Sequence, residues 1–448
     1  MAADRSLFGT DGVRGQAGTY LTPELATALG RAATTTLGLD RPQVLIVRDT
    51  RESGPMLEAA LAAGIADAGG DALLCGVLPT AAAAALVRKL GLDLAVVVSA
   101  SHNPYADNGI KFFSGAGIKL ADDDEARLEE AVRDALAAAQ GAGTAAAPYP
   151  IGRVRELRGA EADYLRALEE GVGLDLTGRR VLLDCANGAA YSAAPEIFMR
   201  LGAEVILTGA EPDGRNINDR CGSTHTEAIA RRMATGEAEI GFAFDGDADR
   251  VLAIDASGQT RDGDELIALI AGNLAAAGEL SGGVAVTVMT NHGFHLAMAE
   301  AGIEVATTAV GDRYVLAELL ERGWRVGGEQ SGHLINTDFA PTGDGIAAAL
   351  LVMRALGERR LDQVHPFQRL PQRLINVKVT DRDAVQGNEA VAGAIEQVTA
   401  ELGGHGRVLI RPSGTEPLVR VMVEAPETTQ ADETCERLAA VVTAELGR

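Results

Sequence analysis

Short apolar runs alternate with longer amphipathic segments along the first three quarters of the chain. Val44–Arg51 begins as an apolar run and ends in polar residues, and the next segment, Met56–Ala68, places its apolar side chains at helical spacing. The same order of strand, polar loop and helix begins again at Val181–Gly188 and at Val284–Asn291. Because strands that alternate with helices are typical of α/β domains, the pattern predicts three similar α/β units.

The final part of the chain follows a different pattern. Leu374–Thr380, Arg407–Gly414 and Leu418–Ala425 are runs typical of antiparallel strands, and Gln430–Leu446 is typical of a closing helix. The expected fold class is therefore α/β: three similar α/β domains with mixed sheets plus a C-terminal α+β domain, arranged around a central cleft.

The length of the chain requires more than one core. Single cores stop growing near ~250–300 residues, and this chain has 448. We expect domains at residues 1–152, 153–256, 257–368 and 369–448. The candidate linkers at their borders are Gly141–Gly152, Asp255–Gln259 and the proline-bracketed His365–Pro371.

The net charge limits the partners that we expect, and the cysteines indicate the cellular location. A net charge of −23 disfavours nucleic acid and anionic membranes as partners. We expect no membrane span, because the longest run without Asp, Glu, Lys or Arg, Ser281–Ala299, contains Asn291, His292, His295 and three glycines. We expect no signal peptide, because the N-terminus has no basic region followed by an apolar run. The four cysteines lie far apart without a CxxC pair, which predicts reduced thiols in a cytoplasmic protein. A monomer and a homodimer are both compatible with these features.

The stretch VVVSASHNPYADNGIKFF, Val96–Phe113, begins as a buried strand and becomes a polar loop. Pro104 cannot continue a strand ladder, and open α/β sheets bind ligands beyond the carboxyl ends of their strands. Ser99 or Ser101 could therefore act as a nucleophile or phosphate carrier. The alternative is a turn whose hydroxyls bond to nearby backbone groups.

Three aspartates, Asp245, Asp247 and Asp249, directly follow the apolar run Ile240–Phe244. Carboxylates at this spacing repel one another unless a divalent cation lies among them, and hard oxygen ligands suit Mg²⁺. A solvated acidic turn is the alternative. The sequence from Asp247 also partly resembles the nucleophile motif of aspartate-based phosphatases.

A turn between two C-terminal strands, RPSGTEPLVR, has the composition of a phosphate-binding loop. Gly414 permits a nest of backbone N–H groups, and Arg411 and Arg420 flank the hydroxyls of Ser413 and Thr415. The alternative is a β-turn with incidental charges.

Two further loops carry weaker signals. GGEQSGH, Gly327–His333, offers donors and acceptors for sugar hydroxyls, although a single histidine near a strand is often structural. FGTDGVRG, Phe8–Gly15, is rich in glycine and carries Arg14. Together, the segments indicate phosphoryl transfer to or from a phosphorylated sugar. A Mg²⁺-dependent phosphatase using Asp247 and a non-catalytic phosphosugar-binding protein remain alternatives.

The same segments, in the same order, resemble the α-D-phosphohexomutases over essentially the whole chain. The motifs are FGTDGVRG, SASHNPYADNGIKFF, FAFDGDADR, VGDRYV, GGEQSGH and RPSGTEP. Gln330 is typical of the branch that acts on glucosamine phosphates, whereas the phosphomannomutase/phosphoglucomutase branch more often carries Met or Lys there. The chain departs from the family's Pro-Thr-Pro at Pro79-Thr80-Ala81.

The resemblance implies a role for each matching residue. Ser101 would carry the phosphate, must be phosphorylated for activity, and would complete a Mg²⁺ site with the three aspartates. Lys111 would be the general acid/base, helped by Arg14 and His102. The substrate would be a small phosphosugar that passes through a bisphosphorylated intermediate. The implied substrate-binding residues are Arg250, Glu329, Ser331, His333, Arg411, Ser413, Gly414, Thr415 and Arg420.

Lysine usage adds an independent argument for Lys111. Only four of the 40 Lys and Arg residues are lysines. A lysine pKa can be lowered by burial or by neighbouring cations, whereas arginine effectively never deprotonates. A lysine in an arginine-rich chain therefore suits a position that must exchange a proton; the alternative is that Lys111 is one of the four lysines by chance.

Overall fold

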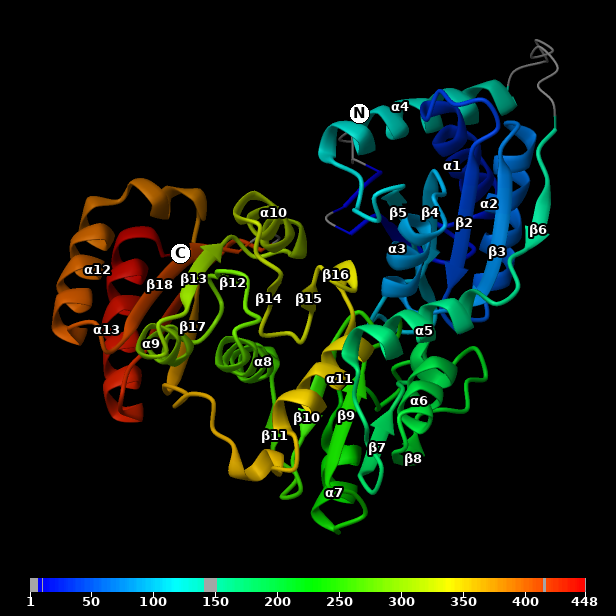
Figure 1. Cartoon of the computed structure of the whole chain (residues 1–448). Helices are drawn as coiled ribbons and strands as arrows, with labels where there is room; N and C mark the ends of the chain where they lie inside the picture. Colours follow the sequence, from blue (N-terminus) through cyan, green and yellow to red (C-terminus); the bar gives the residue numbers. More distant parts are fainter. Residues whose placement is uncertain (1–6, 10, 141–150, 414–415, 448) are drawn as a thin grey trace. The chain divides into compact units, whose positions relative to one another are not determined.

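The computed structural model describes residues 7–9, 11–140, 151–413 and 416–447. These residues form two compact units, of which the first comprises residues 1–289 and 304–365 and the second residues 290–303 and 366–448. The predicted linker at 141–152 falls almost entirely outside the described residues. Each unit is built from its own sheets and helices (Figure 1).

The first sheet of the larger unit contains six strands in the order β1-β5-β4-β2-β3-β6. β2, β3, β4 and β6 are parallel, and β5 runs antiparallel to both of its neighbours. β6 lies beyond the predicted border at residue 152. The strands are β1 Val13–Gln16, β2 Gln43–Arg48, β3 Asp71–Val77, β4 Leu94–Val98, β5 Asp107–Ser114 and β6 Val154–Glu156; the helices between them are α1 Pro23–Thr36, α2 Gly54–Asp67, α3 Thr80–Lys89 and α4 Asp122–Gln140.

Strand periodicity explains how the central strands of this sheet are covered. Val44 and Ile46 of β2 join Val96 and Val98 of β4 in a core formed with α1, α2 and α4. Leu45 and its alternate neighbours point to the opposite face, because successive side chains of a strand alternate. Both faces are buried, so β2 and β4 are continuous apolar runs.

The second sheet has five strands in the order β11-β10-β9-β7-β8. β7, β8 and β9 are parallel, and β10 and β11 form an antiparallel extension. The strands are β7 Arg180–Asp184, β8 Glu204–Thr208, β9 Ile240–Phe244, β10 Val251–Ile254 and β11 Thr260–Arg261; the helices are α5 Ala160–Val172, α6 Ala190–Arg200 and α7 Glu227–Ala234.

The third sheet repeats this plan in the order β13-β12-β14-β15-β16, with β12, β13 and β14 parallel and the other two antiparallel. The strands are β12 Gly283–Thr287, β13 Glu304–Thr308, β14 Val326–Gly328, β15 Leu334–Asn336 and β16 Ala340–Gly343; the helices are α8 Gly263–Ala277, α10 Asp312–Arg322, α11 Gly345–Leu356 and the short 3₁₀ turn Leu361–Gln363. The expectation of three α/β sheets of mixed direction is confirmed.

The smaller unit has an antiparallel sheet in the order β17-β19-β18, as the sequence predicts. Its apolar core lies between this sheet and two helices. The strands are β17 Gln372–Lys378, β18 Arg407–Pro412 and β19 Leu418–Glu424; the helices are α9 His292–Glu300, α12 Glu389–Leu402, α13 Thr428–Leu446 and the 3₁₀ turn Asp383–Gly387. The predicted arrangement of all domains around one cleft remains a prediction.

Two local features of the larger unit are used below: the close contact between α1 and α2, and the hydrogen-bonded cap of α11. α1 and α2 approach closely where they carry glycines: a Cβ on Gly64 would lie 2.1 Å from the Thr27 carbonyl oxygen, and one on Gly30 would lie 2.4 Å from that of Leu61. The N-terminus of α11 is capped by Asp344, whose buried carboxylate accepts hydrogen bonds from the Ala347 N–H and the Tyr164 hydroxyl, each at 2.9 Å.

All four cysteines are free thiols. Cys185, Cys221 and Cys435 are buried, and Cys75 is half-buried. Burial raises the pKa of each thiol, to about 12 for Cys75 and Cys221 and to about 11 for Cys435. Among the described residues, no helix combines the length and the apolar character needed to cross a bilayer.

Candidate active site

Ser101 lies in the loop between β4 and β5, at the carboxyl end of a central strand. Its side chain is buried, and its backbone φ of 51° falls in the left-handed region that a serine rarely adopts. The hydroxyl donates to Asp245 Oδ2 at 2.5 Å and lies 3.4 Å from His102 Nδ1. The fold therefore brings the serine loop against the acidic loop, 144 residues further along the chain.

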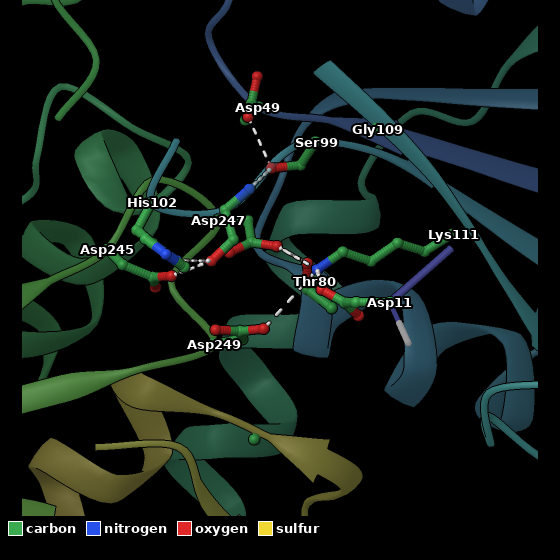
Figure 2. Close-up of polar contacts among 12 residues, drawn as sticks. Asp11, Asp49, Thr80, Ser99, His102, Gly109, Lys111, Asp245, Asp247 and Asp249 are labelled. Carbon is green, nitrogen blue, oxygen red and sulfur yellow. Dashed lines mark hydrogen bonds and ion pairs between the residues drawn. The ribbon is translucent and has the colours of Figure 1, made fainter. Parts of the chain in front are cut away.

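Ser99 has a different environment. Its hydroxyl donates to Asp49 Oδ2 at 2.6 Å and accepts a hydrogen bond from the Ser101 N–H at 2.9 Å (Figure 2). Both interactions are buried; the first joins the loop to Asp49, just after β2, and the second lies within the loop. The alternative of a loop hydroxyl that bonds to nearby backbone therefore applies to Ser99, and of the two serines only Ser101 contacts one of the three aspartates of the acidic loop.

The three aspartates follow β9 and are buried together. Asp245, Asp247 and Asp249 each offer an oxygen within 4.8 Å of the others. Burial, followed by the charges of Asp249 and Asp247, raises the pKa of Asp245. The Oδ1 atom of Asp247 is buried and has no hydrogen-bond partner among the residues that the structure describes. Three converging carboxylates with a free buried oxygen fit a hard divalent cation.

Lys111 lies on β5 with its ammonium group among carboxylates (Figure 2). Its Nζ is 2.9 Å from Asp247 Oδ2, 3.2 Å from Asp11 Oδ2 and 3.8 Å from Asp249 Oδ2. Burial acts to lower the pKa of Lys111, but Asp11, Asp247 and Asp249 act more strongly and raise it above its usual value. The lowered pKa that burial alone would give is therefore absent, and the lysine is a cation in this arrangement.

Of His102 and Arg14, the two residues predicted to assist Lys111, only His102 lies beside the Ser101 hydroxyl. Burial, then the charges of Arg250 and Arg14, lowers the pKa of His102, so this imidazole is neutral near pH 7. Arg14, on β1, pairs with Asp11 rather than with the serine. Arg250 donates its backbone N–H to Asp245 Oδ1 at 3.1 Å.

A cavity of about 330 Å³ in the larger unit is lined by residues of the acidic loop and of Gly327–His333. The latter segment, which was predicted to bind sugar hydroxyls, is called the sugar-reading loop below. Glu329 reaches the cavity from the loop after β14 and accepts the Gly311 N–H at 3.1 Å. His333 is buried between Asp249 and Asp312, at 3.6 Å from each. Ser331 is exposed and is not among the residues that line the cavity. The lining residues are Asp11, Lys119, Asp249, Arg250, Val310, Gly311, Asp312, Arg313, Tyr314, Glu329 and His333.

The predicted phosphate-binding turn belongs to the smaller unit. Arg411 on β18 lies directly opposite Arg420 on β19, and burial followed by the charge of Arg420 lowers the pKa of Arg411. Like charges opposite each other destabilise a sheet, so this pair favours a bound anion. The buried Ser413 hydroxyl has no hydrogen-bond partner in the described part of this unit. Gly414 and Thr415 lie outside the described residues.

The structure adds residues that the sequence motifs did not single out. Thr80 Oγ1 donates to Asp247 Oδ2 at 2.7 Å, and Lys119 bridges Asp11 at 2.5 Å and Asp312 at 2.6 Å. Thr80 lies in the Pro-Thr-Ala segment that was noted only as a departure from the family pattern. Lys119, like Lys111, could have been flagged by the scarcity of lysine.

Comparison with known proteins defines the class that this fold and site represent. The four domain families described as phosphoglucomutase/phosphomannomutase α/β/α domains I, II and III and C-terminal domain match residues 5–138, 162–258, 262–372 and 374–441, respectively. The chain therefore belongs to the phosphoglucomutase/phosphomannomutase family.

The similarity to individual proteins extends over almost the full length. A protein of Pelotomaculum thermopropionicum named phosphoglucosamine mutase is 49% identical over 446 residues, covering 97% of this chain and 98% of the relative. Two solved structures share the fold. A phosphoglucomutase/phosphomannomutase family protein of Burkholderia thailandensis has a TM-score of 0.80 at 24% identity, covering 99% of both chains. N-acetylphosphoglucosamine mutase of Aspergillus fumigatus, in complex with GlcNAc-6P and magnesium, has a TM-score of 0.62 at 18% identity, covering 97% of this chain and 95% of that one.

Proposed function

We propose that this protein is a phosphoglucosamine mutase that interconverts glucosamine 6-phosphate and glucosamine 1-phosphate. The observation that carries the proposal is the buried Ser101 hydroxyl held 2.5 Å from Asp245, inside a cluster of three carboxylates. The full-length similarity to a protein named phosphoglucosamine mutase supports the choice of sugar, as does Gln330 in the sugar-reading loop.

The chemistry consists of two transfers at one serine. A phosphate on the Ser101 oxygen passes to the free hydroxyl of the bound sugar phosphate, breaking the bond to Ser101 and forming glucosamine 1,6-bisphosphate. The sugar then presents its other phosphate, which returns to Ser101 and leaves the isomeric monophosphate. The serine is thus phosphorylated at the start and at the end of each cycle.

Each transfer also moves one proton, from the attacking hydroxyl toward a base and back toward the leaving oxygen. Lys111, His102 and Arg14 are the residues that we assign to this task and to charge neutralisation. His102 is neutral and lies 3.4 Å from the Ser101 hydroxyl, which suits proton acceptance. Lys111 is charged and suits stabilisation of transferring phosphoryl oxygens or proton donation.

We assign Mg²⁺ to Asp245, Asp247 and Asp249 together with the Ser101 phosphate. When bound there, the ion would neutralise charge on the phosphoryl group. The chain's own contribution is to hold these carboxylates at buried positions through Thr80 and Lys111, which both donate to Asp247.

Substrate recognition is assigned to two sets of side chains. In the larger unit, Arg250, Glu329 and His333 line the cavity, and Ser331 belongs to the same loop as Glu329. In the smaller unit, Arg411, Ser413 and Arg420, with Gly414 and Thr415 of the same turn, would bind the phosphate that is not reacting. The four free thiols support the expected cytoplasmic location.

The deciding experiment combines intact-mass measurement with a coupled assay. Purified protein should contain one phosphate that is lost in Ser101→Ala, and this variant should lose all mutase activity while retaining its fold. Wild type should convert glucosamine 6-phosphate faster than glucose 1-phosphate. Faster conversion of the glucose ester would favour a phosphoglucomutase, and steady phosphate release that survives Ser101→Ala would favour a phosphatase using Asp247.

A further inference from the structure

A fully buried arginine lies beneath the Ser101 loop. Arg51 follows β2, and none of its side chain is exposed to solvent. None of the motifs includes it, and it does not line the cavity of the larger unit that holds the sugar-reading loop. Burying a guanidinium without partners is costly, so its contacts indicate what it does.

All five side-chain N–H groups of Arg51 donate hydrogen bonds within the protein. Nε donates to Asp49 Oδ2 at 2.8 Å. Nη2 donates to the carbonyl oxygens of Ser101 at 2.9 Å and Asn103 at 2.8 Å. Nη1 donates to the carbonyl oxygens of Asp107, at 2.9 Å, and of Pro104. Since arginine has five such donors, none remains for a phosphate or a sugar.

The network also reaches the other side of the Ser101 residue. Asp49 Oδ2 accepts the Ser99 hydroxyl, and that hydroxyl accepts the Ser101 N–H. Asp49 Oδ1 accepts a hydrogen bond from the backbone N–H of Arg51 at 3.0 Å. The N–H and the C=O of Ser101 are therefore both fixed by groups that trace back to Asp49 and Arg51.

A second side chain reinforces the same carbonyls from another part of the chain. Asn218 Nδ2 donates to the Ser101 oxygen at 2.9 Å and to the Asn103 oxygen at 3.2 Å. Two donors per carbonyl are unusual for a simple turn. They suit a loop whose serine is held in the left-handed region, with φ of 51°, and such strained positions persist only when their surroundings fix them.

We propose that Arg51 is a positioning residue for phosphoryl transfer at Ser101, acting through the carbonyl oxygens of the loop; this inference rests on the proposed role of Ser101 as phosphate carrier. Transfer requires the serine oxygen, the acidic cluster and the sugar hydroxyl to be aligned, and a displacement of about 1 Å can cost roughly 100-fold in rate. Arg51 fixes the backbone that carries the serine oxygen.

The test compares Arg51→Lys with Arg261→Lys. Lysine keeps the charge but offers three donors instead of five, in a different geometry. Arg261 is a matched control, because it is an arginine of the same unit whose guanidinium pairs with Asp255 and Glu265 instead of the Ser101 loop. Three quantities are measured: kcat and KM for glucosamine 6-phosphate, and the rate at which dephosphorylated protein with Mg²⁺ gains a phosphate from glucose 1,6-bisphosphate by intact mass.

We expect Arg51→Lys to lower kcat and the phosphorylation rate about 100-fold while KM changes less than threefold. Arg261→Lys should keep both rates within threefold of wild type. The proposal is overturned if Arg51→Lys retains its rates, if only KM rises, which would indicate direct substrate contact, or if Arg261→Lys loses as much. If Arg51→Lys does not fold, Asn218→Gly decides: its φ of 59° suits glycine, and a phosphorylation rate that stays within threefold of wild type contradicts the proposal.

The two proposals fail in different ways. Wild-type protein that gains no phosphate from the bisphosphate contradicts the carrier role of Ser101. Wild type that gains it, with Arg51→Lys gaining it equally fast, contradicts the role of Arg51 alone.

Discussion

At the scale of single residues, Ser99 and Ser101 have identical side chains but different hydrogen-bond partners, and we therefore expect different roles for them. The Ser101 hydroxyl donates to Asp245, whereas the Ser99 hydroxyl donates to Asp49 and accepts a hydrogen bond from the Ser101 N–H. Removing a buried hydrogen-bonding group leaves its partners unsatisfied, which costs ~1–3 kcal/mol. Ser99 is therefore expected to matter for loop order but not for chemistry.

Ser99→Ala should reduce the free energy of unfolding by about 1–3 kcal/mol and slow the mutase reaction without abolishing it. Chemical denaturation and the coupled assay measure the two effects. Ser223→Ala, a half-buried loop serine of the same unit, is the control and should change neither. Unchanged stability and full activity in Ser99→Ala would show that the Ser101 N–H does not depend on this hydroxyl.

Which site residues the sequence could reveal depends on how local their signals are. The serine loop and the three aspartates were predicted because each is a short segment that follows an apolar strand, whereas the choice of Ser101 over Ser99 came from the resemblance to the α-D-phosphohexomutases. Arg51 and Lys119 could not be assigned roles, because their partners lie up to 56 and 193 residues away in the chain. No local pattern distinguishes an arginine whose five donors are all buried from an arginine on the surface.

At the scale of elements, the α1–α2 pair depends on two glycines at the contact between the helices. The sequence predicted the second helix from its apolar spacing, and its observed bounds are Gly54–Asp67. It gave no sign that Gly64 was needed for packing, because the carbonyl that excludes a side chain there belongs to another helix.

Gly64→Ala should lower the free energy of unfolding by about 1–3 kcal/mol, since a methyl group 2.1 Å from the Thr27 carbonyl forces the helices apart. Gly272→Ala in α8 is the matched control, because among the described residues nothing beyond the neighbouring backbone of its own helix lies within 4 Å of the added carbon. Replacing this helical glycine should instead stabilise the protein by roughly 0.5–1 kcal/mol. Equal effects of the two substitutions in denaturation curves would contradict the close contact.

The cap of α11 predicts a dependence of stability on pH. Burial is the main reason why the pKa of Asp344 is raised from 3.8 to about 6. Between these values the folded protein binds more protons than the unfolded chain, so this group stabilises the fold below about pH 4, and its contribution is lost as pH rises through 6. Two pKa units correspond to roughly 3 kcal/mol.

Asp344→Asn should remove the pH-dependent contribution of this carboxyl group to the free energy of unfolding. From pH 4 to pH 7, wild type is expected to lose roughly 3 kcal/mol more of its unfolding free energy than the variant does. Urea titrations at several pH values measure the difference between the two proteins, in which all other titrating groups cancel. Parallel curves for wild type and variant would rule out a raised pKa at Asp344.

At the scale of the whole molecule, the net charge of −23 adds to the repulsion within the acidic cluster, where the one ammonium of Lys111 pairs with two of the three carboxylates, so a further cation should stabilise the fold. A ligand that binds only the folded state stabilises it, by ~2.7 kcal/mol at 100 times its Kd. Mg²⁺ should therefore raise the Tm more than NaCl at equal ionic strength, and EDTA should reverse the shift.

The Mg²⁺ effect can be located with two aspartate variants. Asp249→Asn should abolish most of the Mg²⁺-dependent rise in Tm. Asp184→Asn should retain it, because Asp184 is an equally buried aspartate at the end of β7 that bonds to backbone N–H groups instead. A shift that persists in Asp249→Asn would place the ion elsewhere.

The fold class was predictable from the sequence because strand–helix alternation and the final antiparallel pattern are visible over long segments. The division into units was less accessible. α9 follows β12 in the chain, yet it belongs to the unit formed by the C-terminal residues. Its first residues explain why: the Asn291 side chain bonds to both backbone groups of Leu370, and buried Glu424 accepts the His292 N–H at 2.8 Å.

The four thiols, three of them buried and Cys75 half-buried, can report on local unfolding of the protein. Alkylating reagents attack the thiolate, and the raised pKa of every cysteine leaves almost none of that form at pH 8 in the folded protein. Cys435 belongs to the smaller unit, and the other three belong to the larger one. Peptide mass spectrometry after a pulse of alkylation would thus measure the rate at which each unit opens, because the cysteines of the two units are read separately and no label has to be introduced.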